Sequence, residues 1–431
     1  MSKLGKIRWI VENFFKDPER VMQELKQYWL HREEDQKILD AISENTITTF
    51  PMPYSVAPNF IINGKTYCVP MVTEESSVVA AASSAAKFWM TRGGFHTELI
   101  DVEKVGHVHF LWKGEESKLR QHFDELKALL LEQTSELTAN MRKRGGGIRD
   151  IGLRKVEEVP LAQYYQLVVT FDTCDSMGAN FINTVLEAFA RILRQYFLTA
   201  PHFSDAERDV EILMAILSNY TPQSRVRAEV RCAIEELGTI EGYAAAEFVR
   251  RFKMAVDIAR HDIYRAVTHN KGIFNGVDAV VIATGNDFRA VEACGHSYAA
   301  RDGMYRGLSQ CSLDGGIFRF WLELPMAVGT VGGLTRLHPI ARRSLELLGF
   351  PSAKELMQII AAVGLAQNFA AVRSLITTGI QKGHMKMHLN NILLELGATE
   401  EQSKAAVEYF KDKTVSYRAV ADFIRQFKNS C

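Results

Sequence analysis

The sequence has few cysteines, no excess of positive or negative charge and no long apolar runs. Six cysteines occur in 431 residues and none forms a Cys-x-x-Cys pair. This argues against a zinc ribbon or a dense disulfide framework and favours a reducing, cytoplasmic compartment. The 51 Lys and Arg balance the 51 Asp and Glu, so we expect no binding to nucleic acid through bulk charge. The longest apolar stretches, such as residues 78–82, are far shorter than the ~20 residues that span a bilayer. The charged N-terminus lacks an apolar signal core, so we expect no membrane partner.

Nucleotide-binding fingerprints are also missing. The chain contains no Gly-x-Gly-x-x-Gly and no Walker A motif, which argues against a standard Rossmann domain and a P-loop. His384 and His388 have the spacing of zinc ligands on a helix, but Met385 stands where the hydrolase motif requires Glu. We therefore predict no metal site. His107 and His109 alternate on an expected strand and are interpreted as structural.

Hydrophobic periodicity predicts a mixed α+β chain. Residues 1–43 have the spacing of amphipathic helices, the proline-containing residues 44–60 are expected to be extended, and Asn63-Gly64 marks a hairpin. Residues 76–90 carry small Ala and Ser side chains on both faces, which predicts a closely packed helix at the centre of a domain. Capping boxes predict helices that begin after Ser204, Ser352 and Thr399, the first of them running to residue 217.

Changes in the residue pattern near residues 110 and 220 indicate an inserted domain. Its expected elements are a charged helix over 117–143, a strand over 164–171 and a helix over 180–197. Beyond it, apolar residues 278–284 predict a buried strand, and residues 318–324 another. We therefore expect a large domain from residues 1–110 and 221–378, a small domain from 111–220, and a C-terminal helical domain from 379–431.

Taken singly, the polar motifs have ordinary structural explanations. Glu74 and Glu75 precede a helix start, where acidic residues complement the helix dipole, although an anion site with one proton-handling Glu would use the same residues. Lys271 lies before the expected strand and Asp287 at its carboxyl end, so they could form a surface ion pair or line a ligand crevice. The glycine-containing segments 145–147, 177–180 and 329–333 are typical of turns.

Taken together, the motifs have an order that resembles the hydroxymethylglutaryl-CoA (HMG-CoA) reductase family, specifically its class II, soluble bacterial members. The matching segments are APNF (57–60), PMVTEESSVVAAAS (70–83), RGGF (92–95), RGGGIRDI (144–151), DSMGAN (175–180), YRAVTHNKG (264–272), ATGNDFRAVEA (283–293), PMAVGTVGG (325–333), VGLAQN (363–368) and GIQKGHM (379–385). They span about residues 44–395. Ser76 and Ser176 depart from the family's usual Pro and Ala, but neither change removes a functional group.

The resemblance implies a four-electron reduction of (S)-HMG-CoA to mevalonate and coenzyme A by two reduced nicotinamides, in the mevalonate pathway of isoprenoid synthesis. The implied catalytic residues are Glu75, Lys271, Asp287 and His384. Lys271 would stabilise the oxyanion and Asp287 would orient Lys271. His384 would protonate the coenzyme A thiolate, and Glu75 would protonate the second alkoxide. The helix N-terminus and Lys271 favour ionised Glu75, so burial would have to counter them.

The resemblance also implies ligand contacts. The implied substrate-binding residues are Ser77, Arg265, Asn275, Gln367 and Asn368. The implied cofactor-binding residues are Asp150, Asp175, Met177, Gly178, Asn180, Gly329, Gly332 and Gly333. Asp150 could accept a hydrogen bond from the 2′-hydroxyl of NAD and would repel the 2′-phosphate of NADP. Arg149 and Arg154 flank it and could pair with that phosphate instead. We therefore expect a slight preference for NADH, with measurable use of NADPH.

The implied fold is a large α/β domain around the helix at 76–90, with an inserted ferredoxin-like cofactor domain and a C-terminal helical flap. The implied assembly is an obligate homodimer, alone or within a higher assembly of dimers. Its active site would lie at the subunit interface, with residues 44–50 in that contact.

Other functions remain open at this point. The same fold could oxidise mevalonate in catabolism, or a catalytically idle relative could bind coenzyme A as a regulatory partner. The presence of all four catalytic residue types disfavours the idle relative. A zinc hydrolase built on His384 and His388 lacks its Glu and a third ligand.

Overall fold

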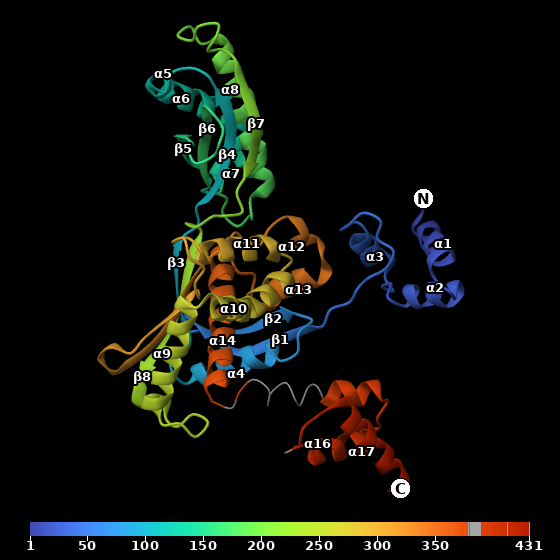
Figure 1. The fold of residues 1–431 in the computed structure, drawn as a ribbon. Coiled ribbons are helices and arrows are strands. Elements are labelled where there is room, and N and C mark those ends of the chain that lie inside the picture. The colour runs from blue at the N-terminus through green and yellow to red at the C-terminus, as the bar shows by residue number, and fades with distance from the viewer. Residues whose placement is uncertain (378, 380–388, 412, 431) are drawn as a thin grey trace.

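The computed structural model describes residues 1–377, 379, 389–411 and 413–430, with side chains up to residue 427. Figure 1 shows an N-terminal helical segment, a large body, a small unit above it and a C-terminal helical unit below it. The large body, the small unit and the C-terminal unit each have their own cluster of buried apolar side chains. The prediction of a mixed α and β chain is confirmed.

The N-terminal segment is helical, as predicted. It contains α1 (Lys3–Phe14), α2 (Pro18–Gln27) and α3 (Glu33–Asp40), and it stands away from the large body in Figure 1. The side chains of Ser2 and Asp17 cap α1 and α2 by accepting bonds from backbone N–H groups. Trp9 and Phe14 are 53% and 69% exposed, so this segment presents apolar surface that the chain itself does not cover.

The large body combines a hairpin, an antiparallel sheet and a group of helices. Its elements are β1 (Tyr54–Ile62), β2 (Lys65–Val72), α4 (Val78–Met90), β3 (His96–Asp101), β8 (Arg225–Ala233), α9 (Ala245–His261), α10 (Ile263–Ala283), α11 (Phe288–Ala299), β9 (Ser309–Ser312), β10 (Ile317–Pro325), α12 (Gly333–Leu337), α13 (Pro339–Leu347) and α14 (Ala353–Ile376). The strands β3-β8-β10-β9 form one sheet, in which β10 is the strand predicted at 318–324. Asn63 and Gly64, both with positive φ, make the predicted turn between β1 and β2.

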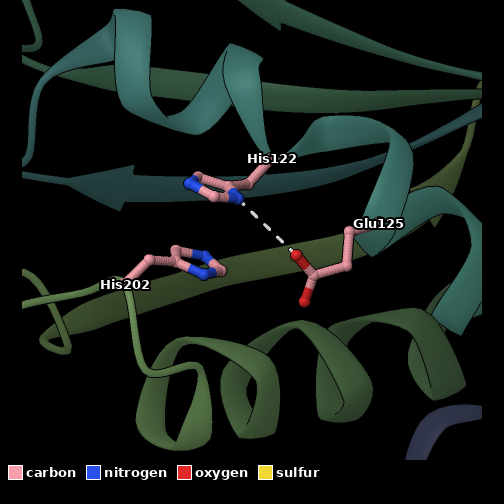
Figure 2. Close-up of side chains that lie close together, drawn as sticks. All are labelled: His122, Glu125 and His202. Atoms are coloured by element: carbon pink, nitrogen blue, oxygen red, sulfur yellow. Dashed lines mark ion pairs between the residues drawn. The ribbon is translucent and has the colours of Figure 1, made fainter.

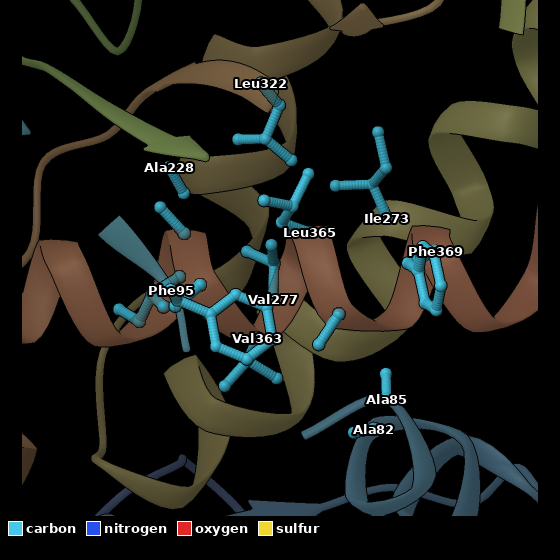
Figure 3. Close-up of a cluster of buried hydrophobic side chains, with 14 of the residues drawn as sticks. Ala82, Ala85, Phe95, Ala228, Ile273, Val277, Leu322, Val363, Leu365 and Phe369 are labelled. Carbon is cyan, nitrogen blue, oxygen red and sulfur yellow. The ribbon is translucent and has the colours of Figure 1, made fainter. Parts of the chain in front are cut away.

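Helix α14 is the most deeply buried helix of the large body. The predicted capping box of Ser352 and Glu355 begins it, and 17 of its 24 residues are buried. The helix predicted at 76–90 exists as α4, and Figure 3 shows its Ala82 and Ala85 beside this core. Only five of the 13 residues of α4 are buried, so the prediction that it lies at the centre of the domain is wrong, and α14 takes that place. Helix α14 is also the one helix in the described part of the chain that is long and apolar enough to cross a membrane. Its burial inside the fold explains that composition.

Two glycines allow α10 and α14 to cross closely. A Cβ added at Gly276 of α10 would lie 2.9 Å from Cβ of Gln367 and 3.0 Å from the backbone oxygen of Val363. A Cβ at Gly364 of α14 would lie 2.8 Å from a methyl carbon of Val277. Any larger side chain would therefore push the two helices apart.

The small unit contains β4 (Lys104–Trp112), α5 (Glu116–Gln121), α6 (Phe123–Gln133), α7 (Ser135–Lys143), β5 (Gly147–Lys155), β6 (Tyr164–Asp172), α8 (Ala179–Thr199) and β7 (Val210–Leu217). The strands pair antiparallel in the order β5-β6-β4-β7. This order, with helices after β4 and after β6, is the β-α-β-β-α-β arrangement of ferredoxin-like folds. It differs from the parallel sheet of a Rossmann domain.

The single helix predicted at 117–143 is divided into α5, α6 and α7. Two further predicted elements are wrong. Ser204 and Glu207 do form hydrogen bonds, since Oε2 of Glu207 accepts from the Ser204 backbone N–H at 2.8 Å, but the residues that follow pair with β4 as strand β7. Residues 278–284 are not a strand but the end of helix α10, which Asp262 caps. This stretch is buried on nearly all sides, so its apolar run has no helical period and cannot be distinguished from a buried strand by pattern alone.

The C-terminal unit is helical, as predicted. It contains α16 (Glu400–Tyr409) and α17 (Tyr417–Ser430), and the predicted capping box of Thr399 and Gln402 is present. Its small apolar core is built around Leu393 and Phe410. Residues 380–388, which include His384 and His388, lie outside the described residues.

Candidate active site

A cavity of about 1010 Å³ lies between the loop that precedes α8 and the helices α10 and α13. Four motif segments line it: residues 73–75 after β2, 176–180 before α8, 285–287 after α10, and the glycine loop that begins at Gly329 after β10. The fold thus brings motifs from distant parts of the sequence to one place. The face of α10 that carries Asn275 and Asp278 forms one wall.

An ion pair involves the cavity residue Glu75. Lys271 of α10 donates from its ammonium to the carboxylate of Glu75, which lies in the loop between β2 and α4. The Lys271 side chain is 58% exposed and the Glu75 side chain 36%, so both remain accessible to a ligand. Lys271 lies one helical turn before Asn275 because residues 263–283 form a helix. The prediction that Lys271 precedes a strand is therefore wrong.

Asp287 also lines the cavity. Its side chain caps α11, accepting from the backbone N–H of Arg289 at 3.1 Å and of Ala290 at 3.2 Å, and it pairs with the Arg289 guanidinium at 3.0 Å. Ala283, the last residue of α10, is 12 positions beyond Lys271, which corresponds to about 18 Å of helix. Within this chain, Asp287 does not hold the ammonium of Lys271.

Asp278 is a cavity residue that the sequence analysis missed. Burial, then the neighbouring Glu292, which also shares a hydrogen bond with it, and then the charge of Glu74 raise the pKa of Asp278 to about 8. Its Oδ1 has no hydrogen-bond partner among the described residues. Asp278 is seven residues after Lys271, two helical turns along one face. A helical interpretation of this segment would have revealed that spacing.

The loop before α8 and the glycine loop after β10 are held together by hydrogen bonds. The backbone oxygen of Asp175 accepts from the Thr330 N–H at 2.8 Å, and the Gly329 N–H donates to the Asn286 side chain at 2.8 Å. A Cβ on Gly329 would lie 2.4 Å from the backbone nitrogen of Met177, so only glycine fits there. The Asp175 carboxylate accepts from the Ala353 N–H at the start of α14, at 2.8 Å.

Lys104, also missed from the sequence, supports the loop that precedes α8 through hydrogen bonds. Its ammonium is buried and donates to the Thr173 hydroxyl and, at 3.0 Å, to the Ser176 backbone oxygen. Burial lowers the pKa of Lys104 to about 8, against the opposing charge of nearby acidic groups. No signal in the sequence separates this lysine from those at the surface.

Comparisons with known proteins identify the family of this chain. The sequence model of the family described as hydroxymethylglutaryl-coenzyme A reductase matches residues 8–389. The chain belongs to this family. The HMG-CoA reductase of Archaeoglobus fulgidus is 38% identical over 372 residues, covering 86% of this chain and 81% of that one. The probable HMG-CoA reductase of Borreliella burgdorferi is 34% identical over 351 residues, covering 81% and 77%.

A solved structure of the same family has a similar fold. The class II HMG-CoA reductase from Streptococcus pneumoniae, bound to NADPH in open conformations, has a TM-score of 0.71 and 38% identity. The match covers 96% of this chain and 100% of that one. This chain is therefore an oxidoreductase of the HMG-CoA reductase family, a group that works with a nicotinamide cofactor.

The substrate-binding residues implied for an HMG-CoA reductase fall into two groups in this structure. Asn275 lines the cavity. Arg265 lies in the first turn of α10, and Ser77, in a left-handed conformation with φ of 74°, lies directly before α4. The structure therefore places Ser77 near the Glu75–Lys271 ion pair in sequence and in fold, while Arg265 lies between one and two turns before Lys271.

Gln367 and Asn368 are buried within α14 rather than exposed in the cavity. The Asn368 side chain accepts from the Ser309 hydroxyl at 2.7 Å, and that hydroxyl lies 2.6 Å from Nε2 of His269. Burial lowers the pKa of His269 to about 3, so this ring is neutral. The Gln367 carbonyl oxygen has no partner among the described residues.

The cofactor-binding residues implied for the family are also divided. Met177, Gly178, Asn180 and the three glycines of the 329–333 loop line the cavity, whereas the Asp175 carboxylate accepts from the first N–H group of α14. Asp150 on β5 is 66% exposed and pairs with Lys127 of α6, whose hydrogen bond lowers the pKa of Asp150. Its neighbour Arg149 pairs with Asp101 at 2.7 Å. Neither Asp150 nor Arg149 lines the cavity.

Proposed function

We propose that this chain reduces (S)-HMG-CoA to mevalonate and coenzyme A, with two molecules of NADH or NADPH, in the mevalonate pathway. The observation that carries the proposal is the Glu75–Lys271 ion pair at a cavity lined by the family's motif loops. Reduction of a carbonyl needs a positive charge for the developing oxyanion and a proton donor beside it. Lys271 supplies the charge, and Glu75 can supply the proton once its carboxylate has been protonated.

Two features of the cavity fit a dinucleotide. Gly178 is the N-cap of α8 and provides no side-chain cap, so the N–H groups of the first turn are available to a pyrophosphate. A Cβ on Gly332 or Gly333 would meet nothing within 4 Å, so this loop leaves room for a ligand. When bound here, the nicotinamide would supply the hydride.

The protein's own side chains manage charge and protons in two stages. In the first stage Lys271 stabilises the oxyanion formed on the thioester carbonyl; the carbon–sulfur bond then breaks, and His384 gives a proton to the departing thiolate. In the second stage the aldehyde becomes an alkoxide beside Lys271 and takes a proton from the Glu75 carboxyl group, which must first take up that proton from solvent because it is a carboxylate in the ion pair. His384 lies outside the described residues, and its role is carried over from the family's motif.

We also propose a homodimer with the active site at the subunit interface. Phe50 lines the cavity yet is 89% exposed, and the N-terminal helices carry the exposed Trp9 and Phe14. Within one chain about 18 Å of helix α10 separates Lys271 from the segment that carries Asp287, so Asp287 can act beside an ammonium only if a second subunit brings one. Sedimentation that shows an active, stable monomer would contradict this arrangement.

The domain boundaries and the coenzyme preference belong to the same proposal. The three apolar cores support a large domain, a cofactor domain and a C-terminal flap at 379–431, but β4 (Lys104–Trp112) belongs to the cofactor domain, so we move the predicted boundary at residue 110 to about residue 103 and keep the one at 220. The preference for NADH rests on Asp150, because its carboxylate would repel a 2′-phosphate. Asp150→Ala should raise activity with NADPH relative to NADH, whereas the same change at the exposed Asp205 should leave the ratio unchanged.

The decisive experiment follows absorbance at the nicotinamide band with HMG-CoA and each coenzyme. Lys271→Met should abolish turnover with both HMG-CoA and mevaldehyde. His384→Gln should impair HMG-CoA reduction more than mevaldehyde reduction, since no thiolate then needs a proton. The proposed function is wrong if the enzyme oxidises neither NADH nor NADPH in the presence of HMG-CoA, and if it also reduces neither NAD nor NADP in the presence of mevalonate and coenzyme A.

A further inference from the structure

The small unit holds a group of three metal-ligand side chains outside the active site (Figure 2). His122 lies between α5 and α6, Glu125 follows within the first turn of α6, and His202 lies in the loop after α8. The possible ligand atoms of the three side chains lie within 4.8 Å of one another. Nδ1 of His122 is 3.6 Å from Oε2 of Glu125. None of the three lines the cavity of the active site.

The surrounding side chains hold the two rings in place. The rings of His122 and His202 are stacked, with centroids 3.5 Å apart and planes inclined by 4°. The Tyr196 hydroxyl lies 3.2 Å from Nε2 of His202, and the ring of Phe203 packs edge-on against His202 at 4.4 Å. Figure 2 shows ring nitrogens of both histidines on the side where the Glu125 carboxylate lies. Three possible donors from two separate chain segments thus lie close together.

The charge of the nearest lysine does not oppose a cation at this point. Lys118 of α5 is paired with the Glu207 carboxylate at 2.6 Å, which offsets its positive charge. The Glu125 side chain is 57% exposed, so its carboxylate can change rotamer at little cost. A divalent cation would reach the group directly from solvent.

We propose that His122, Glu125 and His202 bind a divalent transition-metal ion, and that zinc fits them best. Two imidazoles and one carboxylate are typical zinc ligands, and a water molecule would complete a tetrahedral set. Zinc–ligand bonds of about 2.0–2.2 Å place neighbouring ligand atoms roughly 3.3 Å apart. The present atoms must therefore close by up to about 1.5 Å, and the rings must tilt out of their stack, because the nitrogen lone pair lies in the ring plane. The loop position of His202 permits this movement.

The ion would act on the small unit rather than on the reaction. It would join the α5–α6 junction to the loop after α8, at the far end of α8 from Gly178 and the cavity. Helix α8 has 21 residues, which corresponds to about 30 Å. At that distance the ion cannot touch the substrate, so we expect it to stabilise the ferredoxin-like unit. The site is independent of the proposed reductase function.

The test uses the full-length protein, stripped of metal with EDTA, and zinc chloride as the probe. We expect calorimetric titration to show one zinc equivalent that is lost in His202→Ala. Glu125→Gln should weaken binding at least about 100-fold, beyond the 10–100-fold cost of losing an outer-shell partner. Zinc should raise the thermal midpoint of the native protein but not that of either variant.

A control variant and a conservative variant show whether zinc binds at the proposed group. His261→Ala removes an exposed histidine outside the group and should leave zinc binding unchanged. Glu125→Gln changes an exposed side chain and should fold normally, so it remains informative if His202→Ala does not fold. Absence of zinc binding by the native protein would overturn the proposal. So would equal affinity in the native protein and both variants, because the ion would then be bound elsewhere, for example by the His384 and His388 pair.

Discussion

Asp278 holds a proton in the folded protein that the unfolded chain would release, and replacing it with Asn should change how stability depends on pH. Burial and the neighbouring Glu292 raise the pKa of Asp278 from 3.8 to about 8. Between these values the folded protein binds about one proton more than the unfolded chain. Stability must therefore fall as pH rises through this window. Asn cannot ionise, so Asp278→Asn removes this contribution.

The size of the effect follows from the proton count. One proton bound more tightly by the folded state changes the free energy of unfolding by about 1.36 kcal/mol per pH unit. From about pH 5 to about pH 7, native stability should fall by roughly 2.7 kcal/mol relative to the variant.

The measurement is urea unfolding of the native protein and of Asp278→Asn at three pH values across that window. Protein concentration should be held constant, since the stability of an oligomer depends on it. Asp205→Asn is the matched control, because the Asp205 side chain is 96% exposed. Its pH dependence should follow that of the native protein.

The reasoning fails if the native protein and Asp278→Asn lose stability in parallel as pH rises. That result would mean that Asp278 is already ionised at the lower end of the window. A steeper loss in the variant would have the wrong sign and would point to a proton held elsewhere in the cavity wall.

Two glycine substitutions test the close contacts of the fold, and each is paired with a control glycine. Gly276→Ala should destabilise the protein by about 1–3 kcal/mol through the α10–α14 contact. Gly272 lies in the same helix, but an added Cβ there would meet nothing within 4 Å, so Gly272→Ala should stabilise the protein by up to about 1 kcal/mol. Thermal unfolding distinguishes the two variants, and equal shifts of the midpoint would mean that the helices move apart to accept the larger side chain. Gly329→Ala should raise KM for the nicotinamide coenzyme at least about tenfold, because its Cβ would displace the loop before α8. The control variant Gly152→Ala on β5 should leave this KM unchanged. An unchanged KM in Gly329→Ala would show that the loop after β10 and the loop before α8 move apart freely.

Much of the local structure follows from the sequence because local signals specify it. Asn63-Gly64 forces a turn that few other pairs adopt, and the capping boxes at Ser352 and Thr399 satisfy the first N–H groups of their own helices. The membership of the HMG-CoA reductase family likewise follows from the motif order, and the family comparisons confirm it. These signals act over a few residues, so no knowledge of the fold is needed to interpret them.

Signals fail where burial removes the contrast between faces. Residues 278–284 look like a strand because nearly every side chain of that part of α10 is buried, and the error hid the alignment of Lys271 with Asp278. The capping pair Ser204 and Glu207 is real, yet pairing with β4 makes the next residues a strand. In both cases contacts with distant parts of the chain outweigh the local preference.

The sequence by itself determined which side chains are available for chemistry, and the tertiary structure decided which of them meet. The motif order identified Glu75 and Lys271, but only the packing of α10 against β2 brings them into contact, and only that helix separates Lys271 from Asp287. Lys104 and the group of His122, Glu125 and His202 carry no motif at all. Their properties arise from burial and from segments brought together by folding, which depend on distances in space that spacing along the chain does not encode.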